Sequence, residues 1–374
     1  MSVYRILILG LLTATQATLA WAEPYIAFRE GYKCSACHVN QTGGGMRNEF
    51  GGLYTQTDMT PLMEGATEKA MDFSPQIGSN FTIGADFMAV HEVLLEVDEE
   101  LDGQRYEQDS SNYFGIRSGS LYFEANLIPE MLSIYLDETV TSDYAKSREA
   151  FVLIQGLPYQ GYLKAGRMLL PYGVRVWDDA TFSRRVTGFT FDSQKMGVEF
   201  GFEPGNLFLA AALSNNTQVG AESDNEKQIF SSVGQIFSSV GALYMGSVVL
   251  GASFANNEEH TAYGPYAGVT IGSLTAFCEV DWVQDSGAID QDQFIAFGSV
   301  NYWHREYLNL RVAFDFLDPY DHIEEDESSR LTLGAQAFLT PYLQAGVAYK
   351  LKDSFPQNPQ GNADALTLAL HSFF

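Results

Sequence analysis

Between about residue 76 and the C-terminus, apolar and polar residues alternate along the chain. In one such stretch Leu308, Leu310 and Val312 alternate with Asn309 and Arg311. A repeat of two residues is typical of a β-strand with one apolar and one polar face. The same alternation recurs at 274–282, 331–339, 343–351 and 366–374. This part of the chain is therefore predicted to be all-β.

The connections between these strands are of two kinds, which alternate. Short ones lie at 128–130, 156–158, 203–205, 272–273 and 340–341. Long, polar ones lie between them, at 98–109, 171–193, 215–227, 256–262, 285–291, 318–329 and 353–362. Outer-membrane barrels are built in this way, with their short turns facing the periplasm. The pattern predicts a transmembrane barrel of about sixteen strands over residues 75–374, with both ends in the periplasm.

Two features allow other interpretations. A soluble β-sandwich also alternates, although it hides its apolar face and needs no systematic difference between successive turns. The stretch 228–257 carries no charged residue and contains the heptapeptide Gln-Ile-Phe-Ser-Ser-Val-Gly twice in tandem, at 228–234 and 235–241. Because an insertion of odd length exchanges the two faces of a strand, no single register is predicted here.

Aromatic residues flank several of the short turns. Residues of this kind form belts at the membrane interfaces of barrels. The predicted belt comprises Tyr159, Tyr162, Tyr244, Trp303, Tyr307 and Tyr342. Cys278 falls on the apolar face of its strand and is interpreted as a small hydrophobic residue. The terminal Phe374 resembles the C-terminal aromatic residue of bacterial outer-membrane proteins.

The net charge of the chain and its lack of catalytic motifs exclude several classes of function. Asp and Glu number 47 against 21 Lys and Arg, which gives a net charge of -26. Such an acidic chain is a poor partner for a polyanion, so nucleic acid is excluded. The sequence contains no catalytic triad, phosphate-binding glycine loop or paired-carboxylate motif. No conventional enzyme activity is therefore predicted.

Residues 1–22 have the pattern of a signal peptide. Arg5 precedes an apolar run at 6–12, and Ala20-Trp21-Ala22 matches a small-x-small cleavage site. The protein is thus expected to be exported, with a mature chain that starts near Glu23. Its three cysteines are too few for a disulfide-stapled domain.

Two of the cysteines lie in one motif, Cys34-Ser35-Ala36-Cys37-His38. The C-x-x-C-H spacing is that of covalent haem c attachment. Each thiol can bond one haem vinyl group, and the histidine that follows them reaches the iron as proximal ligand. We therefore predict one haem c on Cys34 and Cys37, with His38 on the iron. A disulfide or half of a zinc site shares the spacing, but zinc needs four ligands and no second Cys or His pair lies nearby.

The sequence does not choose the ligand on the opposite face of the iron, where both methionine and histidine serve in haem proteins. The methionines within reach are Met46, Met59, Met63 and Met71. The histidines farther along the chain are His91, His260, His304, His322 and His371. An open or water-bound iron is a further alternative.

Other residues near the motif suit a flat, acidic ligand. The glycines at 43–45 allow a tight turn, and Arg47 could meet a haem propionate; an ordinary flexible loop is the alternative. The connection 171–193 follows the fifth predicted strand, where many porins fold a loop inward. Around it lie six basic residues, Lys164, Arg167, Arg175, Arg184, Arg185 and Lys195. They are predicted to balance acidic wall residues such as Asp86, Glu124 and Glu279, or to face propionates.

Residues 23–74 are too few to enclose a haem alone, so this cytochrome-like segment is expected to fold into or against the periplasmic mouth of the barrel. Together the two parts resemble the fused cytochrome–porin proteins of outer membranes, best known from iron-oxidising bacteria. The resemblance rests on Pro24, the stretch 27–31, the C-x-x-C-H motif, the pair Phe50-Gly51 and the barrel that follows. It implies that electrons pass from extracellular Fe(II) toward periplasmic cytochromes. The glycine-rich 41–45 departs from the proline-containing stretch expected in iron oxidisers, which leaves the donor open.

The predicted function is an outer-membrane electron-transfer conduit in which one covalent haem c relays electrons between an extracellular donor, with Fe(II) as one candidate, and periplasmic cytochromes. The expected partners are outer-membrane lipid and lipopolysaccharide, a periplasmic c-type cytochrome or other soluble carrier, and an extracellular metal ion or other donor. One alternative is a solute-selective diffusion porin with an accessory or sensory haem. The other is a secreted soluble cytochrome with a long sandwich.

Overall fold

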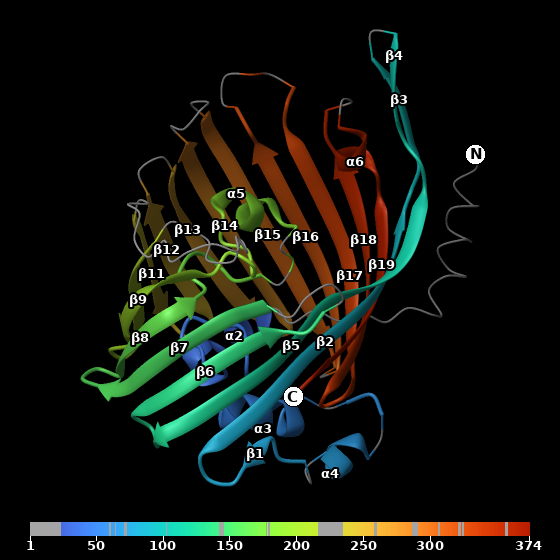
Figure 1. Ribbon diagram of the computed structural model, residues 1–374. Coiled ribbons are helices and arrows are strands. Elements are labelled where there is room, and N and C mark those ends of the chain that lie inside the picture. The colour runs from blue at the N-terminus through green and yellow to red at the C-terminus, as the bar shows by residue number, and fades with distance from the viewer. Residues whose placement is uncertain are drawn as a thin grey trace, which may run out of the picture.

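The computed structural model describes residues 24–374, apart from 60, 64, 71–72, 102, 142–145, 177, 179, 216–234, 258–259, 286–290, 306, 321–322, 324 and 356–357. The predicted signal peptide, Met71, His322 and the first copy of the heptapeptide lie outside the described residues. The described chain is a short helical segment followed by a large antiparallel β-sheet (Figure 1).

The N-terminal segment consists of short helices and tight turns. Its elements are α2 (Tyr25–Glu30), the 3-10 helix η1 (Cys34–Ala36), α3 (Glu49–Thr57) and α4 (Ala66–Ala70). Gly31 ends α2 at φ 67°, a conformation that glycine adopts at little cost. The Asn48 side chain accepts a hydrogen bond from the Gly51 amide and so caps the start of α3. None of the described helices is long and apolar enough to cross a membrane.

The rest of the chain forms an antiparallel sheet that closes on itself, because the last strand, β19, pairs with β2. The two-residue strand β1 (Gln76–Ile77) pairs with β2 as well, which leaves sixteen strands in the barrel over the described residues. These strands are β2 (Phe81–Leu94), β5 (Ser111–Ile128), β6 (Leu132–Thr139), β7 (Lys146–Leu157), β8 (Gly161–Met168), β9 (Lys195–Phe202), β10 (Leu207–Asn215), β11 (Gln235–Tyr244), β12 (Val248–Asn256), β13 (His260–Ile271), β14 (Leu274–Asp285), β15 (Gln291–His304), β16 (Leu308–Asp318), β17 (Ser328–Thr340), β18 (Leu343–Asp353) and β19 (Ala365–Phe373). The predicted all-β fold of about sixteen strands is confirmed.

The apolar face of the barrel points outward. On β16 the polar residues Asn309 and Arg311 are buried inside, whereas Leu310, Val312 and Phe314 expose 42%, 47% and 46% of their surface. A soluble sandwich would bury these apolar side chains, whereas a barrel in lipid exposes them. The burial pattern therefore rules out the sandwich.

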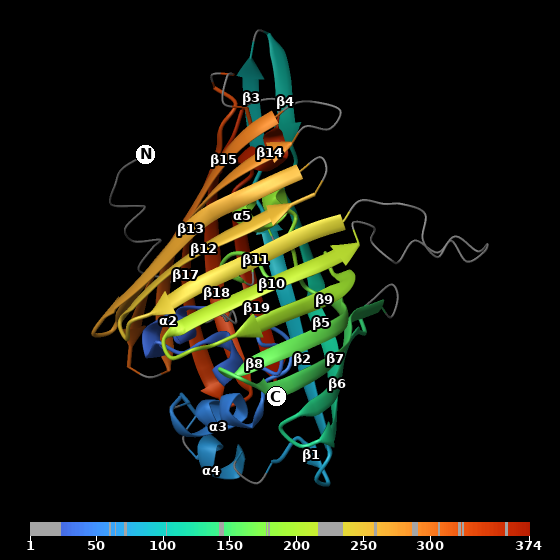
Figure 2. The same ribbon diagram turned by 90° about the vertical axis from the view of Figure 1, so that its left-hand side faces the viewer.

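The two ends of the barrel differ in the length of their connections. At the end that carries α3 and α4, termed the short-turn end, three-residue turns join β5 to β6 and β7 to β8 (Figures 1 and 2). At the opposite, long-loop end, β3 (Val97–Leu101) and β4 (Gln104–Gln108) form a hairpin that projects beyond the barrel. The long polar connection predicted at 98–109 is present between β2 and β5, although the sequence did not predict that it folds as a hairpin. The cross-strand pair of Arg105 and Asp98, 2.7 Å between Nε and Oδ1, helps the strands to continue.

The structure also selects a register for the repeated heptapeptide. The second copy opens β11, with Ser239 opposite Ala211 of β10 and opposite Phe254 of β12. Ser238 is buried in the barrel interior, and Phe237 is exposed on the outside. The strand that the sequence favoured in this region is thus confirmed, with its phase now defined.

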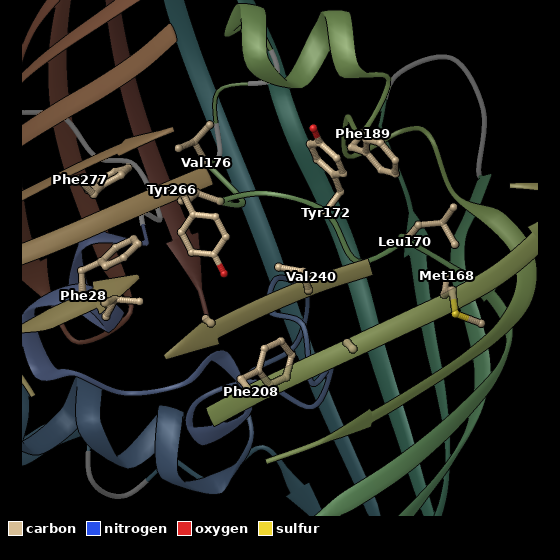
Figure 3. Close-up of a cluster of buried hydrophobic side chains, with 14 of the residues drawn as sticks. Phe28, Met168, Leu170, Tyr172, Val176, Phe189, Phe208, Val240, Tyr266 and Phe277 are labelled. Atoms are coloured by element: carbon tan, nitrogen blue, oxygen red, sulfur yellow. The ribbon is translucent and has the colours of Figure 1, made fainter. Parts of the chain in front are cut away.

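The barrel interior holds α2 of the N-terminal segment and the connection between β8 and β9, which contains α5 (Phe182–Thr187), whereas α3 and α4 lie beyond the strand ends (Figures 1 and 2). We call this connection, residues 169–194, the inward loop. It follows β8, the fifth barrel strand, as predicted. Figure 3 shows that apolar side chains from these parts meet inside the barrel. Phe28 stacks on Phe277 of β14 with ring centroids 5.0 Å apart, and Tyr172 stacks on Phe189 at 4.4 Å.

The predicted aromatic belt is wrong in part. Tyr159 is 75% exposed, as a belt residue should be, but Tyr162 and Trp303 are buried inside the barrel. Trp303 packs on Tyr25 of α2 at 5.6 Å between ring centroids. Tyr244 faces inward as well, because it lines the interior cavity described below. These rings have polypeptide rather than lipid as their neighbour, because the N-terminal segment occupies this end of the barrel.

Candidate functional site

A large cavity lies inside the short-turn end of the barrel. The space in which the centre of a water molecule fits measures about 210 Å³, whereas two other hollows measure about 10 Å³ each, roughly the room of a single water. Cys34, Cys37 and His38 line the large cavity. The barrel wall and the inward loop contribute much of the rest, including Tyr122, Tyr244, Tyr266, Gly173, Phe191 and Phe373. The N-terminal segment and the barrel therefore enclose one chamber together.

The C-x-x-C-H motif is folded into a tight turn on this chamber. The amides of Cys37 and His38 donate to the Cys34 carbonyl at 3.2 and 3.1 Å. The chain then returns across the motif, where the Asn48 amide donates to the Cys37 carbonyl at 3.0 Å. Both cysteines are free thiols. The turn thus presents two thiols and one imidazole to the same space.

The glycines after the motif form a tight turn, as predicted, rather than an ordinary flexible loop. Gly43, Gly44 and Gly45 all have positive φ angles, of 89°, 79° and 65°. A Cβ atom on Gly45 would lie 2.4 Å from the Tyr135 hydroxyl oxygen, and one on Gly43 would lie 3.1 Å from the Cys34 Cβ. The loop therefore depends on glycine for both its conformation and its close contacts.

His38 is held in its neutral form. The His38 side chain lines the cavity, so part of its surface is exposed there and the residue is half-buried. Burial, assisted by the nearby Arg47 guanidinium, lowers the pKa of His38 to about 4. The Nδ1 atom is buried and makes no hydrogen bond. A neutral imidazole with an unpaired ring nitrogen is suited to bind a metal.

The thiols are held in their protonated form. Burial raises the pKa of Cys34 to about 11, and burial also raises the pKa of Cys37. A thiol protonated at neutral pH is a weak nucleophile. The Arg175 guanidinium lowers the pKa of Cys34, but the effect of burial is larger.

Two arginines reach the cavity from opposite sides. The Arg47 guanidinium lies over the Phe373 ring at 3.9 Å from its centroid. Arg175 of the inward loop hydrogen-bonds the Gly43 carbonyl and donates to the Leu169 carbonyl at 3.0 Å. Both side chains line the chamber. Guanidinium groups at these positions suit a ligand with carboxylates.

The structure distinguishes among the residues predicted as the other ligand of the iron, opposite His38. Met59 is buried and lines the cavity. Met46 is also buried but does not line the cavity, and its amide donates to the Tyr135 hydroxyl at 3.0 Å. Met63 is 54% exposed, away from the chamber. His371 is buried on the inner face of β19 with Nε2 2.6 Å from an Asp86 oxygen, and it does not itself line the cavity. Of the described methionine candidates, Met59 alone shares the chamber with His38.

A buried polar network anchors the motif to the barrel wall. The Asn40 amide donates to both carboxylate oxygens of Glu149 at 3.1 Å, and its oxygen accepts from Lys164 at 3.0 Å. Lys164 also pairs with Glu199 at 2.9 Å, and Tyr162 donates to Glu199 at 2.8 Å. The predicted salt network around Lys164 is confirmed, although its acidic partner differs from those that the sequence proposed.

The inward loop covers the cavity on its long-loop side. The Gly173 amide donates to Ser253 at 2.8 Å, and the Val174 amide donates to Glu279 at 3.0 Å. Farther along, an Asp178 oxygen lies 3.1 Å from Lys350 Nζ and 3.4 Å from an Arg330 nitrogen. Burial raises the pKa of Asp178, but the positive charges of Lys350 and Arg330 together lower it by more, so the pKa lies well below its usual range. The loop is thus tied to both sides of the barrel interior.

Sequence reasoning missed the wall residues of the chamber. Tyr122 and Tyr266 lie on different strands, and no local motif marks them. One signal does exist for Tyr266. Tyr266 is paired with Gly251 on the neighbouring strand, and its ring lies over that glycine. A Cβ atom added to Gly251 would lie 2.1 Å from the tyrosine ring. A large inward side chain opposite a glycine marks a place where the ring lies flat along the wall.

Comparisons with known proteins support the fold. No protein-family profile matches the chain, and no curated protein matches it in sequence. Among the solved structures, OmpT, an outer membrane protein of Vibrio cholerae, is similar with a TM-score of 0.58 and 10% identity over 79% of this chain and 100% of its own. OprB of Pseudomonas putida gives 0.57 and 10% over 83% and 96%. The outer membrane channel DcaP of Acinetobacter baumannii gives 0.55 and 10% over 81% and 99%.

Identities near 10% establish similarity of fold alone. The apolar outer surface adds an independent argument, since a closed barrel exposes such a surface only to lipid. The chain has the fold of the bacterial outer-membrane porins and lies in an outer membrane.

Proposed function

We propose that the protein is an electron-transfer conduit of the outer membrane that carries one covalent haem c in the cavity. It connects an extracellular donor, such as Fe(II), with a soluble periplasmic carrier. The observation that supports this most is the position of the C-x-x-C-H motif, whose two thiols and imidazole line a ligand-sized chamber inside the barrel. A haem c would supply a one-electron redox centre.

The residues of the chamber have complementary roles in this proposal. Cys34 and Cys37 would form the thioether bonds, and neutral His38 would ligate the iron. Met59, which lines the same cavity, would supply a further ligand to the iron. Arg47 and Arg175 would neutralise the propionates. Residues of both the segment and the barrel are needed, which fits a segment too short to enclose the group alone.

The packing of the barrel interior favours electron transfer over solute flow. The N-terminal segment fills the short-turn end, and Gly173 and Val174 of the inward loop are hydrogen-bonded across the lumen to the opposite wall. The membrane layer is about 25 Å thick, which is long for one redox centre. The donor must therefore enter the lumen from the long-loop side, while the carrier docks at the short-turn end.

Covalent attachment is tested by replacing each cysteine with serine. C34S and C37S should each lower the amount of haem that survives denaturation and extraction, and the haem that remains, held by a single thioether bond, should give a shifted pyridine haemochrome spectrum. C278S is the matched control, because Cys278 lies on the exposed outer face; it should retain a full complement. Equal haem in all four proteins, or none in the unmodified one, would refute the proposal.

Electron transfer is tested separately with His38→Ala. This variant should keep an assembled barrel, seen by its heat-modifiable migration in detergent gels, but should lose reduction by an external donor such as Fe(II). Reduction at the unmodified rate would rule out His38 as a ligand of the redox centre.

A solute-selective diffusion porin with an accessory or sensory haem is the second candidate. It is favoured by the shared fold, since one matching structure is described as an outer membrane channel and another as an anion-selective porin from Comamonas acidovorans. Conductance in planar bilayers separates the two. A large, steady open pore supports the porin, whereas low conductance together with donor-dependent reduction supports the conduit.

A further inference from the structure

An apolar patch lies in the open at the short-turn end, directly over the chamber. It consists of Tyr32, Phe50 and Leu53, which are 38%, 44% and 50% exposed. The Tyr32 and Phe50 rings meet edge to face with centroids 5.7 Å apart. Figures 1 and 2 place α3, which carries Phe50 and Leu53, beyond the strand ends and away from the apolar belt of the barrel.

Helix α3 turns its apolar side chains outward, which is unusual for a helix that packs on a core. Its inner face carries the small residues Gly51 and Thr55, both buried. A Cβ on Gly51 would lie 2.2 Å from the Cys37 carbonyl oxygen, so the helix rests directly on the attachment turn. The outward face therefore lies one helix thickness, about 10 Å, from Cys37.

The patch also borders the chamber itself. Tyr32, Gly51 and Tyr54 line the cavity, so Tyr32 belongs to both the exposed patch and the chamber wall. A partner seated on the patch would cover this edge of the chamber. The short distance between the patch and Cys37 suits electron transfer, because the electron can pass between two proteins that are close without any bond between them.

The charged residues of α3 and of its C-terminal end are acidic. Glu49 at the start of α3 and Asp58 after its end are both exposed. Between residues 48 and 58 there is no basic residue. Lys33, close to the patch in sequence, pairs with Glu203 at 3.4 Å and donates to the Gly205 carbonyl at 2.8 Å. The helix thus presents an apolar centre between two carboxylates.

We propose that Tyr32, Phe50 and Leu53, with Glu49 and Asp58 beside them, form the docking face for a soluble electron carrier whose own face is apolar at its centre and positively charged at its rim. Weak redox encounters bury small interfaces of this kind. Opposite charges raise the association rate more than the affinity. The inference rests on the proposed electron-transfer function and extends it to a named surface and a partner of defined charge.

The charge is tested with the double variant E49K/D58K in the full-length, haem-loaded protein. The chemically reduced protein is mixed in a stopped-flow instrument with an oxidised, basic soluble cytochrome c. The second-order rate should fall roughly tenfold at low salt, and the difference should shrink as the ionic strength rises. With an acidic cytochrome as probe, the same variant should react faster.

The matched control is E96K/E100K, which makes the same charge change on exposed residues at the long-loop end. Its rate with the basic probe should equal that of the unmodified protein. The apolar centre is tested with F50S/L53S, which should lower the rate at every ionic strength. Covalent haem content and the absorption spectrum should stay unchanged in each variant, which shows that the site is assembled.

The outcomes are separable. An unmodified protein without covalent haem would overturn the proposed function and this inference together. A haem-loaded E49K/D58K protein that reacts like the unmodified one, or like E96K/E100K, would overturn the inference alone. Unchanged rates in F50S/L53S would likewise overturn the inference, because the apolar centre would then play no part in docking.

Discussion

At the scale of single residues, the candidate site depends on positions where even one carbon atom does not fit. Gly45 approaches the barrel-wall residue Tyr135, and Gly51 approaches the Cys37 backbone. In both places a glycine lets the N-terminal segment touch another part of the structure. The shape of the chamber therefore depends on these glycines, which have no side chain, as much as on the side chains that line it.

Gly45→Ala should disrupt the turn that follows the C-x-x-C-H motif. The added Cβ would lie 2.4 Å from the Tyr135 hydroxyl, and the residue has φ 65°. Left-handed backbone alone costs a non-glycine residue about 1–2 kcal/mol, and the contact adds to this. We expect a clear loss of covalent haem per chain and a lower melting temperature.

Gly78→Ala is the control that separates the cost of the left-handed backbone from the cost of the Tyr135 contact. Gly78 has a similar φ of 68° but no heavy atom within 4 Å of its added Cβ. This variant should show the backbone cost only and should keep its haem. Equal behaviour of both variants would mean that the Tyr135 contact does not matter.

At the scale of elements, the inward loop is fixed by ion pairs where it crosses the lumen. Asp178 meets Lys350 and Arg330 on neighbouring strands. Since loops carry few ladder hydrogen bonds, these contacts decide whether the loop stays in place. The position of the loop should consequently respond to pH.

Acid should release the inward loop. The pKa of Asp178 lies below its usual 3.8 in the folded protein, because Lys350 and Arg330 outweigh the effect of burial. The unfolded state therefore takes up the proton first, and the stabilisation is complete above about pH 5 and falls as the pH drops below 3.8. Hydrogen exchange followed by mass spectrometry over residues 169–194 should show a loss of loop protection in acid, once the rates are corrected for the intrinsic exchange rate, which itself falls as the pH drops.

Asp178→Asn should give fast loop exchange at neutral pH and little further change in acid. Asp192→Asn is the control from the same loop, because that side chain is 73% exposed and 4.0 Å from its Arg148 partner. Exposed pairs contribute about 0–1 kcal/mol, so this variant should follow the unmodified protein. Slow exchange in Asp178→Asn would show that other contacts hold the loop.

At the scale of the whole molecule, local patterns predicted the barrel and its ends but not its interior. Alternation along β16 determines which face is apolar, and the turn lengths determine which end is which. The contents of the lumen depend on contacts between distant residues. Trp303 looked like a belt residue because nothing near it in sequence shows that Tyr25 packs against it. The motif predicted the thiols and the imidazole of the site, whereas its walls come from strands that only the closed barrel brings together.

The N-terminal segment and the barrel should behave as one unit through Asn40. This buried side chain joins Glu149 and Lys164. Its loss leaves charged partners with fewer hydrogen bonds, at a cost of roughly 1–3 kcal/mol. In Asn40→Ala we expect faster proteolysis between α4 and β1 while the barrel keeps its heat-modifiable migration.

Gln41→Ala is the neighbouring control, because Gln41 makes only a 3.4 Å bond to the Val39 carbonyl within the same turn. It should be cleaved at the unmodified rate. If Asn40→Ala were equally resistant, the segment would be held by its apolar contacts alone.

The tandem heptapeptide gives the chain two ways to thread the same strand. If the first copy took the place of the second, seven positions of β11 would keep identical side chains, and Ala242, Leu243 and Tyr244 would be replaced by Gln, Ile and Phe. The turn into β12 would then be seven residues longer. Gly246 of that turn lies against Gly31, where an added Cβ would be 2.6 Å from its carbonyl oxygen. A longer turn would displace this contact, so the segment that carries the C-x-x-C-H motif also distinguishes a correctly threaded barrel from one shifted by a repeat.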